Sequence, residues 1–201
     1  MDPTSIHPTD FEAVRSAFQD MREIPWRGTV PTPQCRYLDD PPGKALALAY
    51  AQEHPRQEAA SGLRVPVFCA EIPVTPTNRT EGYLPTTLLK QLGGPQAERR
   101  ESAYEKTMRL EFLLRKFEVK LVILTDVHRL VTPGGKRLLE HEVDWIEWVF
   151  KSEIGRIPLV LVGEHSMMER MAAHNQKLEG IMGYIPLPGG NTPGIAARAA
   201  Y

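Results

Sequence analysis

Continuous apolar runs alternate along the chain with segments in which apolar residues recur every three or four positions. The runs predict buried β-strands, and the periodic segments predict amphipathic helices. The predicted strands cover residues 63–72, 119–126, 156–164 and 184–187. The predicted helices cover residues 10–21, 45–52, 84–92, 98–117, 137–152 and a segment that ends at 174. Strands that alternate with helices in this order favour βαβ units and therefore an α/β fold with a parallel sheet.

Prolines and glycines mark the borders of the folded part. A proline-punctuated segment, 25–33, follows the first helix, and the last residues are rich in Gly, Pro and Ala. A chain of 201 residues can bury one substantial core. We therefore expect an N-terminal helix and linker over 1–34, one α/β domain over 35–188 and a disordered tail over 189–201.

The most informative run is 119–130, in which an apolar strand ends at Asp126. Open α/β sheets bind ligands at the C-terminal ends of their strands. In P-loop NTPases an Asp at this place helps to hold Mg²⁺ beside the phosphates of a nucleotide. A hydrolase is expected to have a second acid next, whereas this chain has Val127. A polar residue also ends many buried strands without any function, so Asp126 needs a partner motif upstream.

A phosphate site would need backbone N–H groups and a lysine before that strand. In the pattern G-x-x-x-x-G-K-[ST], Gly43 and Lys44 fit, but Leu38 replaces the first glycine and Ala45 replaces the hydroxyl that binds magnesium. The residues after Ala45 have high helix propensity, which would place Pro42 to Ala45 at the positive end of a helix. The alternative is a Pro-Pro-Gly turn that opens an ordinary helix.

Composition narrows the class of protein. With 24 basic and 25 acidic residues the net charge is −1, so any contact with nucleic acid must come from a local basic patch. Cys35 and Cys69 lie far apart without metal-ligand spacing, which predicts reduced thiols and neither a disulfide framework nor a zinc site. The N-terminus lacks a leader pattern and no apolar run could span a bilayer. We therefore expect a cytoplasmic protein with no membrane partner.

The order of these motifs resembles the TniB/TnsC family of AAA+ transposition ATPases. The resemblance covers roughly 35–188 and rests on the P-loop-like turn together with segments 65–77, 89–93, 121–130 and 157–163. It implies an AAA+-like P-loop NTPase domain that binds ATP and Mg²⁺, with Asp126 as the catalytic and metal-binding residue. The nucleotide-binding residues would be Pro42, Gly43, Lys44, Ala45 and Asp126. Because the chain ends soon after the last predicted strand, we expect the helical lid of AAA+ sites to be missing.

Three departures from the family pattern weaken the expectation of catalysis. The family's apolar run is followed by Asp-Glu-x-His-x-Leu, whereas residues 126–130 read Asp-Val-His-Arg-Leu. The family's second apolar run ends in a threonine, which is Glu164 here. Ala45 is the third departure. The three residues Ala45, Val127 and Glu164 predict poor positioning of the metal and of the attacking water. Hydrolysis should therefore be impaired, although Lys44 could still bind a nucleotide.

The resemblance also implies partners. Family members assemble on double-stranded DNA as homo-oligomers and link a target-selection protein or target site to a transposase. The candidate DNA-binding residues lie at the start of the long helix, where basic side chains and N–H groups can neutralise phosphates, and are Arg99, Arg100, Ser102 and Lys106. The alternative is a solvated helix end in which Glu98 and Glu101 pair with these arginines.

Two functions remain open at this point. One is an ATP-dependent regulator of transposition that binds DNA and hydrolyses ATP slowly or not at all. The other is a non-catalytic adaptor that uses the same fold to recruit a transposase or a target-selection partner. His128 and Arg129 could serve as a nucleotide sensor and as an arginine that faces a neighbouring subunit, or they could make ordinary loop hydrogen bonds.

Overall fold

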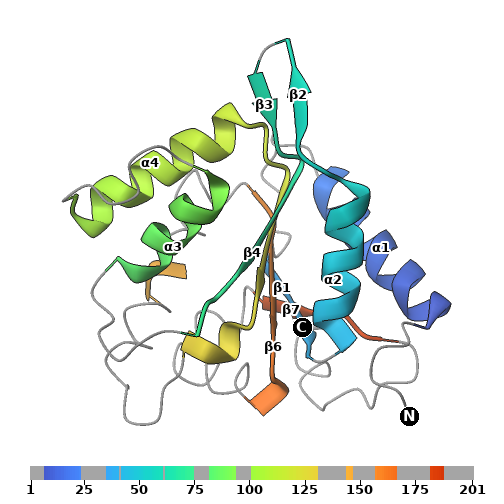
Figure 1. Cartoon of the computed structure of the whole chain (residues 1–201). Coiled ribbons are helices and arrows are strands. Elements are labelled where there is room, and N and C mark those ends of the chain that lie inside the picture. The colour runs from blue at the N-terminus through green and yellow to red at the C-terminus, as the bar shows by residue number, and fades with distance from the viewer. Residues whose placement is uncertain are drawn as a thin grey trace, which may run out of the picture.

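A five-stranded parallel sheet forms the centre of the protein and carries helices on both faces (Figure 1). The computed structural model describes residues 7–23, 35–40, 42–60, 62–74, 82–93, 101–130, 144–146, 157–166 and 182–187. The strand order is β4-β5-β6-β1-β7. These strands are β1 (Cys35–Asp39), β4 (Val67–Glu71), β5 (Leu121–Thr125), β6 (Leu159–Gly163) and β7 (Met182–Tyr184). The predicted α/β fold with a parallel sheet, of the P-loop NTPase kind, is confirmed.

The helices form one layer on each side of the sheet. In Figure 1, α1 and α2 lie on the right and α3 and α4 on the left. Their bounds are α1 (Pro8–Glu23), α2 (Pro42–Glu53), α3 (Tyr83–Leu92) and α4 (Ala103–Lys116). A short 3-10 helix, η1 (Val127–Leu130), follows β5, and a hairpin of β2 (Gln57–Ala59) and β3 (Gly62–Arg64) extends beyond α2. The sheet and its two helix layers therefore form a three-layer α/β/α sandwich.

Two apolar cores, one on each face of the sheet, explain the continuous apolar runs. All residues of β5 are buried. Val122 and Leu124 pack in the core on the side of α3 and α4, whereas Leu121 and Ile123 pack in the core on the side of α1 and α2. Successive side chains of a strand point to opposite faces, so a strand covered on both sides must be apolar throughout.

The first helix packs on α2 through a single apolar stripe. Val14, Phe18 and Met21 are buried at helical spacing, and the Phe18 ring lies edge-on against Tyr50 of α2 with 5.0 Å between ring centroids. Burial of these three apolar side chains stabilises the packing of α1 against the domain. The helix predicted over 10–21 is confirmed and is slightly longer.

The long helix α4 begins later than predicted, because a capping box fixes its start. The Ser102 hydroxyl accepts a hydrogen bond from the Glu105 N–H, and the Glu105 carboxylate accepts one from the Ser102 N–H. These bonds to the Ser102 backbone and hydroxyl lower the pKa of Glu105. Glu101 pairs with Arg109 at 3.0 Å. The local pattern Ser-x-x-Glu thus overrides the apolar periodicity that suggested a start at 98.

Other boundaries also differ from prediction. The run predicted as one strand over 63–72 is divided by Pro66 into β3 and β4, because proline has no N–H for the ladder. Residues 53–62, whose polar composition predicts a turn, contain β2, and the last strand is 182–184 instead of 184–187. Of the helix predicted over 137–152, only 144–146 are described, and they are helical. Of the helix predicted to end at 174, residues 165 and 166 are described, and they are helical. The predicted linker and tail lie outside the described residues.

Both cysteines are free thiols in the described structure, as the sequence predicts. Burial raises the pKa of the Cys35 thiol far above its usual range. Burial, with a smaller effect of Lys44 that lowers it and of Glu71 that raises it, brings the pKa of Cys69 to about 11. Neither group is therefore a reactive thiolate.

Candidate functional site

Carboxylates gather at the C-terminal edge of the sheet, which is the lower edge in Figure 1. Glu71 ends β4, Asp126 follows β5, Glu164 follows β6 and Asp40 follows β1. The strands are parallel, so their C-terminal ends meet along one edge. The edge is thus strongly acidic and needs cations to hold these groups together.

Lys44 of α2 and Arg129 of η1 supply those cations. Lys44 Nζ donates a hydrogen bond to Asp126 Oδ2 at 2.5 Å and lies 3.6 Å from Glu71 Oε1. Arg129 Nη1 donates to Glu71 Oε1 at 2.8 Å and to the Ile72 carbonyl at 2.9 Å, and Nη2 lies 3.4 Å from Asp126 Oδ1. Two acids and two bases therefore alternate in a closed network of ion pairs.

Burial makes this network energetically important. Asp126 is 3% exposed, and an ionised carboxylate at such a place requires nearby positive charge. Partial burial lowers the pKa of Lys44, but its hydrogen bond to Asp126 and the charges of Asp126 and Glu71 outweigh that effect, so the pKa is raised. Lys44 is consequently fully charged at neutral pH. The two residues that the sequence singled out independently, Lys44 and Asp126, are in direct contact.

The phosphate-binding half motif adopts only part of the expected geometry. Gly43, Lys44 and Ala45 lie in the first turn of α2, where N–H groups have no partner within the helix and can bind an anion. Leu38, which replaces the first glycine, is fully buried in β1, and the Asp40 N–H donates to the Gly163 carbonyl at 3.1 Å. Phosphate contacts would therefore come from the start of the helix and not from a wide encircling loop.

Leu38 also explains why position 43 is a glycine. A Cβ atom at Gly43 would lie 2.7 Å from Leu38 Cγ and 3.3 Å from a methyl group of Val162. Such an approach leaves no room for a side chain. The close contact of α2 with the end of β1 therefore sets the position of Lys44 above the sheet edge.

A set of oxygen and nitrogen ligands lies beside this ion pair. One ligand atom each of Asp40, Asp126 and His128 lies within 4.8 Å of the others. The Thr125 hydroxyl and His128 Nδ1 are both buried without a hydrogen-bond partner among the described residues. Thr125 lies on the sheet face that carries α2, like Leu121 and Ile123 of the same strand. Carboxylate and hydroxyl oxygens suit Mg²⁺. Asp40 and Asp126 are the residues that would hold a divalent cation here.

The side chain of Val127 points away from the place where a hydrolase would need its second acid. Asp126 has a positive φ of 58°, and the chain then enters η1 with Val127 fully buried among the residues of the α3 and α4 core. A Cβ atom at Gly163 would lie 2.5 Å from Val127 Cγ2. Position 127 therefore faces the core, and a side chain there does not point toward Lys44. Glu164, by contrast, is exposed.

The candidate DNA-binding residues are only partly described. Ser102 is fully used by the start of α4, since its hydroxyl donates to Glu105 Oε2 at 2.8 Å and accepts from the Glu105 N–H at 3.2 Å. Lys106 is half-buried on the same helix. Arg99 and Arg100 lie outside the described residues. Glu101, which could have paired with them, contacts Arg109 instead.

Sequence reasoning missed Glu71 and Asp40. In the sequence, Glu71 is only one residue of a predicted strand, although its position as the last residue of β4 is a usable signal in a parallel sheet. Asp40 lies in the half motif, at a position for which the pattern G-x-x-x-x-G-K-[ST] specifies no residue. Both contribute to the site because neighbouring strands bring their ends together.

Repulsion between the acidic groups at this edge should lower the free energy of unfolding. Burial and the charge of Asp126 raise the pKa of Asp40, against smaller lowering effects of His128 and Lys44, and Glu164 adds the smallest effect, which also raises it. A raised pKa means that folding disfavours the charged form, so stability should decrease as pH rises from the unfolded to the folded pKa. Asp40→Asn should be more stable than the parent at pH 7, and the gain should vanish below a pH of about 4.

Urea denaturation at pH 7 and at low pH measures this difference. Glu58→Gln, on the exposed hairpin, is the matched control and should show no such pH-dependent gain. An equal effect of Asp40→Asn at both pH values would contradict the assignment of a charge penalty to this group.

Comparisons with known proteins agree with the fold. A family model described as the bacterial TniB protein matches residues 16–179, which is most of the chain. Among curated proteins none matches the chain. Within the described residues, no helix has the length and apolar character that a bilayer-spanning helix requires. The chain therefore belongs to the TniB family and is a transposition-associated AAA+ protein with a P-loop NTPase-like fold.

Proposed function

We propose that this protein binds ATP with Mg²⁺ at the Lys44–Asp126 site and acts as an oligomer on double-stranded DNA, where it couples target-site selection to a transposase. The observation that carries the proposal is the contact between Lys44, at the start of α2, and the buried carboxylate of Asp126. A lysine at a helix start and an aspartate at the adjacent strand end are the two charges that a nucleotide and its cation require.

The charge balance of the site makes the cation essential. Acidic groups at the sheet edge outnumber Lys44 and Arg129, so the free ATP anion would be repelled. A divalent cation between Asp126, Asp40 and the phosphates reverses that balance. Lys44 could then leave Asp126 and contact the phosphates. We therefore expect nucleotide affinity to depend strongly on Mg²⁺.

Hydrolysis is impaired under either alignment of the acidic pair. If Asp126 is the first acid of the family pattern, Val127 replaces the second. If the pattern Asp-Glu-x-His-x-Leu is instead aligned on His128, Asp126 takes the place of the second acid and Thr125 that of the first. The second alignment has support from geometry, because Asp126 faces Lys44 and Val127 faces the core. One acid is missing in both cases, and the hydroxyl at Ala45 is missing as well.

One observation favours the alternative function of a non-catalytic adaptor. Lys44, Asp126, Glu71 and Arg129 already satisfy one another in a closed network of ion pairs. Such a network stabilises the fold without any nucleotide. A protein that uses this fold only to recruit a transposase or a target-selection partner would need no more than this.

Nucleotide binding should depend on Lys44. Lys44→Ala removes the only lysine at the sheet edge in the described structure, and should weaken binding of Mg²⁺-ATP by roughly tenfold or more, the loss of one charged hydrogen bond to phosphate. Titration with a fluorescent ATP analogue measures the affinity. Lys116→Ala, on the exposed end of α4, should bind like the parent. Equal affinity of Lys44→Ala would favour the adaptor.

An acid at position 127 should not restore hydrolysis. Val127→Glu places a carboxylate in an apolar core against Gly163, so the variant should lose stability and still turn over ATP no faster than the parent. Phosphate release and thermal unfolding measure the two effects. Val127→Thr, which adds no charge, should destabilise the protein less. Fast turnover by a fully stable Val127→Glu protein would contradict this reading of the site.

DNA binding should rest on a few phosphate contacts. If Arg100 contacts a phosphate, Arg100→Ala should weaken binding about equally for all sequences and reduce the salt slope by about one. Filter binding or fluorescence anisotropy at several salt concentrations measures the slope. Arg115→Ala is the control, because Arg115 pairs with Glu111 at 2.6 Å. An unchanged salt slope would favour the alternative in which Arg100 contacts no phosphate and is solvated. A tight one-to-one complex with a short duplex would contradict binding as an oligomer.

A further inference from the structure

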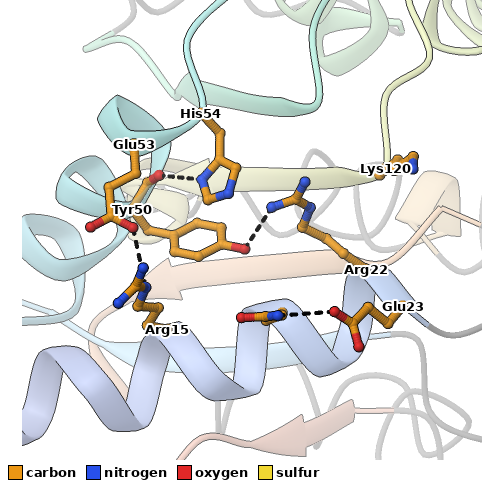
Figure 2. A pocket seen from close by; sticks show the side chains of 8 residues that line it. Arg15, Arg22, Glu23, Tyr50, Glu53, His54 and Lys120 are labelled. Atoms are coloured by element: carbon orange, nitrogen blue, oxygen red, sulfur yellow. Dashed lines mark hydrogen bonds and ion pairs between the residues drawn. The ribbon is translucent and has the colours of Figure 1, made fainter.

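A polar pocket lies at the opposite end of α2 from the Lys44 site. It has a volume of about 540 Å³ and is bounded by the C-terminal parts of α1 and α2 and by the residue that precedes β5. Figure 2 shows Arg22 of α1 reaching across to the hydroxyl of Tyr50 of α2, with the His54 ring next to the Tyr50 ring. Lys120 stands at the rim, at the N-terminal edge of the sheet.

Positive charge in this pocket is not fully compensated. Arg15 pairs with Glu53 at 3.3 Å, and Glu23 accepts a hydrogen bond from Gln19 at 2.9 Å. Arg22 and Lys120, however, have no carboxylate partner among the residues that the structure describes. Within that part of the chain, one of the five N–H groups of the Arg22 side chain makes a hydrogen bond. The pocket thus offers a guanidinium and an ammonium to an anion.

The cationic groups are held in place before any ligand arrives. Arg22 Nη1 donates to the Tyr50 hydroxyl at 3.0 Å, and its guanidinium carbon lies 6.0 Å from the centre of the Tyr50 ring. Tyr50 is 1% exposed and is fixed by the edge-on contact with Phe18. A guanidinium fixed in this way loses little side-chain freedom when it binds.

His54 adds a third polar group with a defined orientation. Its ring lies 4.5 Å from that of Tyr50, and Nδ1 is 3.0 Å from the Tyr50 carbonyl oxygen. A carbonyl oxygen only accepts hydrogen bonds, so Nδ1 carries the proton. Nε2 is then an acceptor in the neutral ring and donates to an anion only when the ring is protonated. Three different segments, the end of α1, the end of α2 and the residue before β5, therefore each contribute one basic residue to the lining of this pocket.

We propose that this pocket binds a phosphate group, carried either by the DNA backbone or by a free phosphate compound. A phosphate presents oxygens in several directions and suits a guanidinium fork together with a point charge on a separate segment. The site is distinct from the Lys44 site, because the two lie at opposite ends of α2. It does not depend on nucleotide binding.

The test uses the full chain, and the His54 signal distinguishes this pocket from the Lys44 site at the other end of α2. Inorganic phosphate is titrated at constant ionic strength, and binding is followed by calorimetry and by the NMR signal of the His54 ring. Lys120→Gln should weaken phosphate binding roughly tenfold, the effect of losing about 1.4 kcal/mol of interaction. Lys116→Gln, an exposed lysine on the other face, is the matched control.

Lys120→Gln is expected to fold, because Lys120 is exposed and its structural hydrogen bond, from the backbone N–H to the Pro66 carbonyl at 3.0 Å, is kept. Arg22→Gln is a second variant, which should also lose phosphate binding and shift the Tyr50 signals. Unsaturable phosphate binding at the His54 signal of the parent protein, or equal affinity in Lys120→Gln, would overturn the proposal.

A second arm distinguishes the two sources of phosphate. A short duplex DNA is titrated against the parent, Lys120→Gln and Lys116→Gln. If DNA supplies the phosphate, Lys120→Gln should weaken duplex binding and reduce the salt slope by about one. If inorganic phosphate binding is lost but duplex binding is unchanged, the pocket binds a free phosphate compound.

Discussion

The ion pair between Lys44 and Asp126 is the interaction on which the arrangement of the sheet edge depends. Asp126 is buried, has a left-handed backbone conformation and begins the turn into η1. Without the ammonium of Lys44 and the guanidinium of Arg129, its charge would have no compensation in a nearly water-free place. The pair also ties α2 to the end of β5, so the helix start, the strand end and η1 form one unit with Glu71 of β4.

The sequence was most informative where local pattern and tertiary environment agree. The apolar run of β5 is buried on both faces, and the two charged residues recognised from half motifs, Lys44 and Asp126, meet in space. Local pattern could not reveal that Leu38 belongs to a strand, because its conformation depends on pairing with β6. It also could not place Glu71 beside Arg129, 58 positions away, since that contact arises only when β4 pairs with β5.

The start of α4 and the pocket illustrate two further limits. The same stretch of serine, arginine and glutamate suggested a phosphate-binding patch, although Ser102 and Glu105 in it are a local capping signal. For α1, periodicity identified the buried face but not its docking partner. The contact of Phe18 with Tyr50, which brings Arg22 to α2, follows from tertiary packing alone. Features that depend on which elements are neighbours remain beyond pattern analysis.

The contact between Val127 and Gly163 means that the side chain at one position restricts which side chains the other can accept. While Val127 fills the space at Gly163, position 163 has no room for any side chain, and an acid at 127 has nowhere polar to go. An acid at position 127 would require the turn after β5 to change first, so this position cannot acquire a carboxylate in a single step. Among related sequences, the side-chain volumes at positions 127 and 163 should therefore covary, because a larger side chain at one position requires a smaller one at the other.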